Sequence, residues 1–295
     1  MRDKYGEIAS VLKSASIALF GLGLLAFLSA IAVASLRLRL IIKAQGNIPV
    51  TFMEAVSLTF IGYFFNNFLP TSIGGDVVKA YYLSKKAHEK TGSFTSVFVD
   101  RAVGLITMIF MAFIALFFVK DGIIDNSVRW MIYVITAGSI FFIALIMNKK
   151  VAKKFSFVLI VFKPIEMKMK KLYDAVNKYR NHKMLMLQSV AISVISQLLF
   201  FVNIGLLAAS IGSALPAMEI LLRMPVVSTM SLLPSINGLG LREGSTVVLF
   251  GPLIGKGNAF AVSVLWLLVL FITSIIGGVI YGLSPQFKVK LKELE

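Results

Sequence analysis

Residues 259–283 read AFAVSVLWLLVLFITSIIGGVIYGL, and no charged residue interrupts them. An α-helix needs about 20 mostly apolar residues to cross the hydrocarbon core of a bilayer, so this run predicts a membrane-spanning helix. Five further long apolar runs occupy Ile17 to Leu36, Thr51 to Leu69, Phe94 to Val119, Val128 to Met147 and Met184 to Ile211. The sequence therefore predicts an all-α polytopic membrane protein.

The composition of the whole chain agrees with this class. Hydrophobic residues make up 58% of the 295 residues and charged residues 15%, with a mean hydropathy of +0.87, whereas soluble domains contain about 45–50% apolar and about 25% charged residues. A soluble globular enzyme and a disordered chain are both excluded. The chain has no cysteine, which excludes disulfides and thiolate metal sites. We expect one domain over residues 1–295, with no cofactor and no bound metal.

Two shorter apolar pieces, Met218 to Leu233 and Ser245 to Ile254, flank a polar stretch that is rich in glycine. Short pieces with a break between them predict discontinuous or re-entrant helices. Unwound backbone is tolerated at membrane depth only where it is buried in protein or lines a cavity. Counting these pieces, we expect about eight membrane segments, two of them broken or re-entrant, around a polar cavity.

Basic residues in the loops predict the orientation. Residues 148–183 carry eleven Lys and Arg against Glu166 and Asp174, and cytoplasmic loops hold such an excess of positive charge. With this linker inside, both termini are expected in the cytoplasm, in a protein of the cell membrane. Apolar residues lie among the lysines of the linker, a pattern that fits either an amphipathic helix on an anionic leaflet or a solvated basic loop. Because the basic residues follow the membrane faces, the net charge of +16 does not indicate nucleic-acid binding.

Several charged residues lie within or beside the apolar runs. Arg37, Arg39 and Lys43 lie on the side that this topology places outside, so either the first helix continues past Leu40 or these cations have a function. A charge that faces lipid at mid-bilayer costs roughly 2.5–3.5 kcal/mol, so the others must face one another, the interface or a cavity. If they are structural ion pairs, the pairs are Asp76/Lys79, Asp100/Arg101, Glu219/Arg223 and Arg242/Glu243.

Two breaks in the apolar pattern resemble each other. Residues 69–75 read LPTSIGG and residues 233–238 read LPSING. Proline stops helical hydrogen bonding, and glycine allows the backbone to expose its N–H groups. Such N–H groups at helix starts attract anions, and transporters place them at substrate sites. The breaks are therefore candidate anion-binding elements, whether they form a true repeat or match by chance.

Together, the three polar stretches resemble the lysylphosphatidylglycerol synthase transmembrane family, also called the flippase-like domain family. They are NNFLPTSIGGDVVK at 66–79, Asp100-Arg101 with Gly104, and LPSINGLGLREG at 233–244. The resemblance covers essentially the whole chain and implies a polytopic domain that moves or presents lipids. It implies aminoacylated phospholipid cargo in some relatives and polyprenyl-linked or glycolipid cargo in others. At Lys79 relatives often have arginine, so the positive charge is kept but the bidentate fork for phosphate is lost.

Family members that transfer lysine carry an additional soluble catalytic domain. The twelve residues that follow Leu283 are too few for such a domain, so we expect that this chain is not an enzyme. We therefore expect no catalytic residues and a function in lipid binding or movement.

These observations lead to the hypothesis of a flippase or transporter for an anionic lipid or a polyprenyl-phosphate-linked lipid. Buried cations would hold the head group by charge-assisted hydrogen bonds, with Arg37 and Arg39 guiding phosphate at the outer face. Asp76, Asp100 and Glu243 would orient the cations or take up a proton. The full set of candidate ligand-binding residues is Arg37, Arg39, Asn66, Asn67, Gly74, Gly75, Asp76, Lys79, Asp100, Arg101, Ser235, Asn237, Gly238, Gly240, Arg242 and Glu243.

The expected partners are membrane lipids that are anionic or bear phosphate, and nucleic acid is not among them. The alternative hypothesis is a non-transporting membrane protein that anchors or regulates a separate lipid-modifying enzyme through the basic linker. The two hypotheses predict opposite sensitivities. Charge reversal in the linker would abolish the function of a partner protein, whereas neutral substitution of the buried charges would abolish that of a transporter.

Overall fold

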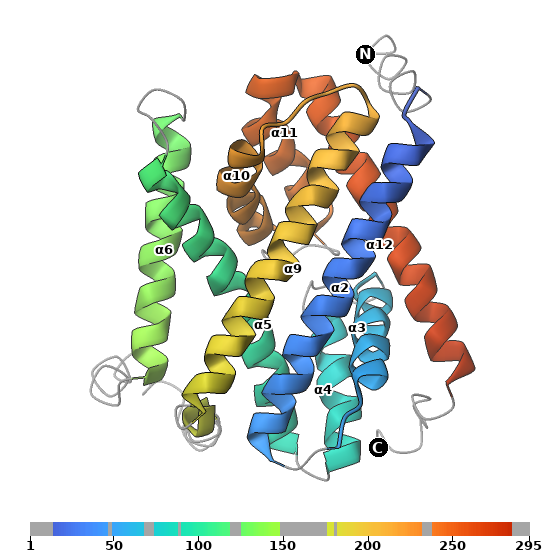
Figure 1. Ribbon diagram of the computed structural model, residues 1–295, viewed down its shortest axis with the longest axis vertical. Coiled ribbons are helices and arrows are strands. Elements are labelled where there is room, and N and C mark those ends of the chain that lie inside the picture. Colours follow the sequence, from blue (N-terminus) through green and yellow to red (C-terminus); the bar gives the residue numbers. More distant parts are fainter. Residues whose placement is uncertain are drawn as a thin grey trace.

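The computed structural model describes residues 14–46, 49–67, 74–87, 90–118, 125–147, 176–179, 182–231 and 238–284. Within these ranges the elements are all helical, and no strand is present. The predicted all-α class is therefore confirmed. Figure 1 shows long helices that run through much of the height of the molecule, with shorter helices packed among them.

Ten helical elements, apart from a short turn at residues 176–179, make up this part of the chain. They are α2 (Ile17–Gln45), α3 (Phe52–Asn66), α4 (Gly74–Ala87), α5 (Lys90–Ala115), the 3₁₀ turn η1 (Leu116–Phe118), α6 (Asn126–Met147), α9 (Lys183–Ser210), α10 (Ala217–Met230), α11 (Leu241–Ile254) and α12 (Lys256–Leu283). Four segments are long and apolar enough to cross a membrane: Ile17–Gln45, Lys90–Phe118, Lys183–Ser210 and Lys256–Leu283.

Helix α2 is longer than its apolar run. It begins after Ser16, whose side chain accepts a hydrogen bond from the N–H of Leu19, and it continues for 29 residues. Of the two explanations considered for Arg37, Arg39 and Lys43, the structure confirms that the first helix continues past Leu40. Arg37 and Arg39 lie in the last three turns of this helix. Both guanidinium groups are consequently fixed to a rigid element.

The apolar run at 51–69 differs most from its prediction. Helix α3 ends at Asn66 after 15 residues, and Gly74–Ala87 forms a separate helix, α4, that the sequence pattern did not predict. The two helices touch through their backbones at Gly62 and Gly75, where a Cβ atom on Gly75 would lie 2.0 Å from the Gly62 carbonyl oxygen. Glycine at this crossing therefore allows α4 to lie directly against α3.

The short apolar pieces form α10 and α11, each of 14 residues. A proline lies inside each helix, Pro225 in α10 and Pro252 in α11. The structure confirms two separate short helices at these positions. Ser235 and Asn237, in the break between them, lie outside the described residues.

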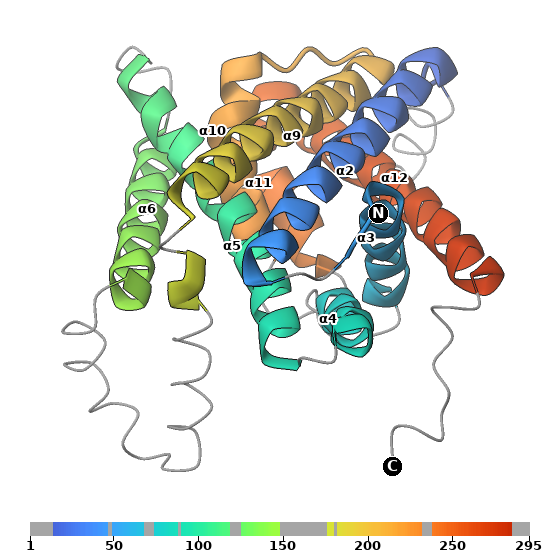
Figure 2. The same ribbon diagram turned by 60° about the horizontal axis from the view of Figure 1, so that its bottom comes forward.

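Helices α2 and α9 run side by side in both views (Figures 1 and 2). Polar side chains of α9 bond the backbone of α2: Asn203 Nδ2 donates to the Gly23 carbonyl at 2.9 Å, and Ser196 Oγ donates to the Ala30 carbonyl at 3.0 Å. Interhelical hydrogen bonds and small residues are the usual means of packing helices in a bilayer. This pair fixes one wall of the cavity described below.

A small part of the basic linker also packs against the helices. Residues 176–179 form a helical turn in which Tyr179 is 4% exposed, and Tyr179 Oη donates to the Ile41 carbonyl at 3.2 Å. Tyr179 lies in an apolar cluster with Ile41 and Val99. This end of the linker is therefore buried against α2 and α5, and most of the predicted amphipathic segment lies outside the described residues.

Candidate lipid-head-group site

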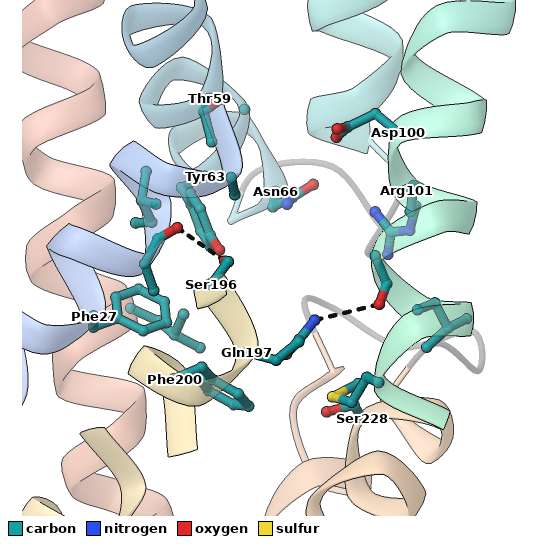
Figure 3. Close-up of a pocket in the computed structure, with 18 of the residues that line it drawn as sticks. Phe27, Thr59, Tyr63, Asn66, Asp100, Arg101, Ser196, Gln197, Phe200 and Ser228 are labelled. Carbon is teal, nitrogen blue, oxygen red and sulfur yellow. Dashed lines mark hydrogen bonds between the residues drawn. The ribbon is translucent and has the colours of Figure 1, made fainter. Parts of the chain in front are cut away.

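The four long helices and four of the shorter ones surround a cavity of about 360 Å³ (Figure 3). Apolar side chains such as Phe27, Phe200 and Trp266 line part of it. Its charged lining residues are Arg37, Lys79, Arg101 and Arg242, together with Asp76 and Asp100. Six of the sixteen predicted site residues are thus charged groups on one cavity, although they come from α2, α4, α5 and α11.

Arg37 and Asp100 form a buried ion pair on this cavity. Arg37 Nε lies 2.7 Å from Asp100 Oδ1, and Nη2 lies 3.2 Å from Oδ2, so the pair is bidentate. A third donor, Nη1, bonds Ser193 Oγ at 3.0 Å. The guanidinium fork fits a carboxylate in this way, and each hydrogen bond is strengthened by charge. The pair joins α2, α5 and α9.

Gly104 makes room for this ion pair. A Cβ atom on Gly104 would lie 2.6 Å from Arg37 Nη1, closer than any real contact of that kind. The Gly104 carbonyl in turn accepts a hydrogen bond from Gln197 Nε2 at 3.3 Å, as Figure 3 shows. Packing therefore explains the glycine in the Asp100-Arg101-x-x-Gly104 pattern, because a side chain at this position would displace the guanidinium group of Arg37.

Asp76 sits between two cations. Lys79 Nζ lies 2.8 Å from Asp76 Oδ1, and Arg101 Nη1 bonds Asp76 Oδ2. The Asp76 side chain is 12% exposed and that of Arg101 is 31% exposed, so Arg101 is the more accessible partner. Figure 3 shows the Arg101 guanidinium extending from α5 toward the middle of the view, opposite Asn66.

The predicted pair Asp100/Arg101 is wrong. Asp100 and Arg101 are neighbours within α5, but each pairs with a residue of another helix: Asp100 with Arg37 of α2, and Arg101 with Asp76 of α4. The predicted pairs Asp76/Lys79, Glu219/Arg223 and Arg242/Glu243 are confirmed.

Arg242 enters the cavity from the first turn of α11. Its Nε lies 3.0 Å from Glu243 Oε1, and its guanidinium carbon lies 5.2 Å from the centre of the Trp266 ring. Glu243 also accepts a hydrogen bond from the N–H of Gly240 at 2.6 Å, just before the first turn of α11. Glu243 thus orients the arginine and closes the helix start, where Gly240 has a φ of +81°.

The amides and glycines of the first break have local roles. Asn66 Oδ1 accepts a hydrogen bond from the N–H of Gly75 at 2.7 Å, which ties the end of α3 to the start of α4. Asn66 lines the cavity, whereas Asn67, Gly74 and Gly75 do not. Gly238, at the second break, has a φ of +76° and lies against Ser231.

Two arginines lie away from the cavity: Arg39, a candidate site residue, and Arg223, a member of one of the possible ion pairs. Arg39 Nε donates to the Val50 carbonyl at 3.1 Å and so holds the connection between α2 and α3. Arg223 pairs with Glu219 at 2.7 Å and donates to the Leu249 carbonyl at 2.7 Å, joining α10 to α11. Neither arginine lines the cavity. Within the described ranges, His, Asp and Glu form no group of three or more that could hold a metal ion.

Several polar residues of the cavity were not among the predicted site residues. They are Thr59, Tyr63, Ser196, Gln197, Ser228 and Ser231. A signal for those on α9 exists in the sequence: Ser189, Ser193, Ser196 and Gln197 recur at helical spacing inside an apolar run. Polar residues on one face of a membrane helix predict that this face is turned toward protein or a cavity.

These features define a class: a polytopic helical membrane protein whose buried charges meet around one cavity. The chain belongs to the lysylphosphatidylglycerol synthase TM region family, whose model matches residues 4–278. The matched region is the non-catalytic, transmembrane part of that synthase, which places the protein in lipid handling. No curated protein and no solved structure is a match to this chain.

Proposed function

We propose that the protein is a flippase or transporter for an anionic lipid or a polyprenyl-phosphate-linked lipid. The observation that carries the proposal is the cavity lining, in which four cationic side chains face two carboxylates. An excess of positive charge in a low-dielectric site attracts an anion strongly. A phosphate supplies both the compensating charge and several acceptors for charge-assisted hydrogen bonds.

The exposures of the cations suggest an order of engagement. Arg101 is 31% exposed at its side chain, whereas Arg37 is 9% and Arg242 is 2% exposed. Arg101 therefore meets the head group first, and its fork replaces one bond to Asp76 with bonds to phosphate. Lys79 keeps its contact with the carboxylate of Asp76 during this exchange, so that charge is never left unpaired.

The carboxylates would serve as orienting groups and as proton acceptors. Release of Arg101 leaves Asp76 with one cation, which favours uptake of a proton by that carboxylate. A proton taken up on one side of the membrane and released on the other would couple transport to a proton gradient. In the proposed arrangement the protein has about eight membrane segments in the cell membrane, with both termini in the cytoplasm.

Transport is tested in liposomes that contain the purified full chain. Fluorescent phosphatidylglycerol and fluorescent phosphatidylcholine report movement between leaflets when a membrane-impermeant reductant quenches the outer label. We expect movement of the anionic lipid, and a loss of about tenfold or more in Arg101→Ala and Arg242→Ala, since each loses a charge-assisted contact worth about 1.5–3 kcal/mol. Lys86→Ala, which removes a cation that does not line the cavity, should transport normally.

Unchanged transport by folded Arg101→Ala and Arg242→Ala would overturn the proposal. If charge reversal of the linker at 148–183 abolished cellular function in that case, the protein would act as a partner of a lipid-modifying enzyme.

A further inference from the structure

A second cavity, of about 610 Å³, lies between α4, α5 and α6. Its lining differs from that of the first, because side chains such as Ile106, Ile109 and Ile135 make it almost entirely apolar. Water that fills an apolar space of this size gains little free energy. A hydrocarbon chain that binds there is stabilised, because its apolar surface is removed from water. Its volume also lies within the range of ligand pockets, about 300–1,000 Å³.

The two cavities share three lining residues, two of which form an ion pair. Asp76, Arg101 and Leu105 line both of them. The Asp76–Arg101 ion pair therefore lies at the boundary between the first, charged cavity and the second, apolar cavity. A ligand that occupied both spaces would carry its charge on one side of this pair and hydrocarbon on the other.

The second cavity is open to the side of the molecule. Val77, Phe94 and Phe98 line it and are 50%, 44% and 42% exposed. Both phenylalanines belong to the candidate span Lys90–Phe118, so in a bilayer this apolar opening would face the lipid. In Figure 2, α6 stands at the edge of the molecule beside α5, and α4 lies at the foot of α5.

Resting on the proposed function, we infer that the second cavity holds the hydrocarbon chain of the lipid whose anionic head group lies among the cations of the first. The substrate class is then an amphiphile that arrives sideways from the bilayer, with its phosphate at Arg101 and its chain between α5 and α6. A free phosphate or a soluble phosphate ester fills only the charged half of this paired site and binds weakly.

Gly138 of α6 provides a way to fill the second cavity. It lines this cavity, and a Cβ atom built on it has no heavy atom within 4 Å. Gly138→Leu therefore places a side chain in open space without displacing the backbone. Gly282→Leu is the matched control, because Gly282 is also an exposed helical glycine with open space around it and lines neither cavity.

The experiment uses the full chain in lipid nanodiscs with photoactivatable phosphatidylglycerol that carries a diazirine at the end of one acyl chain. Crosslinked peptides are identified by mass spectrometry. We expect crosslinks at the peptides of α5 and α6 that contain Phe98, Ile106 and Ile135. Gly138→Leu should reduce them about tenfold relative to Gly282→Leu, since filling the space denies the chain its apolar contacts. Glycerol phosphate in excess should compete poorly.

Two outcomes overturn the inference: crosslinks spread over all lipid-facing helices, or crosslinking that Gly138→Leu leaves unchanged. The same experiment with photoactivatable phosphatidylcholine separates this failure from that of the proposed function. If both lipids crosslink equally at the second cavity and Gly138→Leu blocks both, the chain site stands and anion selectivity fails. If phosphatidylglycerol alone is retained through Arg101 but its chain labels the outer surface, the head-group site stands and the chain site fails.

Discussion

Removal of Arg37 should destabilise the protein mainly by leaving Asp100 buried without its cation. The two side chains are 9% and 11% exposed and form a bidentate pair. Breaking a buried pair at one partner costs about 3–5 kcal/mol, because the remaining charge is desolvated and uncompensated. Arg37→Met should therefore lose about 3–5 kcal/mol of unfolding free energy, whereas Arg37→Met/Asp100→Asn, which removes both charges, should lose clearly less.

The assay is a double-mutant cycle on the free energy of unfolding in detergent micelles. We expect a coupling free energy of about 2–3 kcal/mol between Arg37 and Asp100. The control is the cycle on Lys86 and Glu54, whose side chains are 38% and 27% exposed and should couple by less than about 1 kcal/mol. A loss below about 1 kcal/mol in Arg37→Met, or additive losses in the double variant, would refute the reasoning.

Two further predictions concern packing and pH. Gly75→Ala forces α4 away from α3, because the new methyl group would lie 2.0 Å from the Gly62 carbonyl oxygen. It should lower thermal stability in detergent, whereas Gly21→Ala, with no heavy atom within 4 Å, should not; equal stability of the two variants would contradict the close contact. Tyr179 lies outside the four candidate spans, and burial raises its pKa to about 12. The stability that its neutral hydroxyl contributes is present below about pH 10 and lost as pH rises toward 12, so Tyr179→Phe should lose about 1 kcal/mol at pH 8. The gap between the two proteins should narrow above pH 10 in an unfolding titration, and a constant gap would exclude this linkage.

The long helices could be predicted because their signal is local. The runs that became α2, α5, α9 and α12 are each long enough to cross a membrane, and their apolar composition alone identifies them. Helix α4 was missed because Gly74–Ala87 begins with two glycines, carries three lysines and has almost no net hydropathy. Such a segment resembles a loop, and its helix depends on the backbone contact with α3.

Ion pairs were predictable only where both partners lie within one helical turn. Asp76/Lys79 and Glu219/Arg223 are at i,i+3 and i,i+4 spacing, which places their side chains on one face. The pairing of Arg37 with Asp100 depends on how α2 packs across α5. A local sequence pattern does not specify how two distant helices pack. The predicted cluster of charges was nevertheless useful, since six of those charged residues line one cavity.

The contacts of Arg37 impose an order on the biogenesis of the protein. Helix α2 is the first of the four candidate spans to be synthesised, and its arginine bonds an acid 63 residues later and a serine 156 residues later. Helix α2 is therefore complete before either partner of this charge has been synthesised. Arrival of α5 then neutralises the charge, and arrival of α9 completes its hydrogen bonds. A chain that ended between α2 and α5 would therefore carry this arginine without its carboxylate partner.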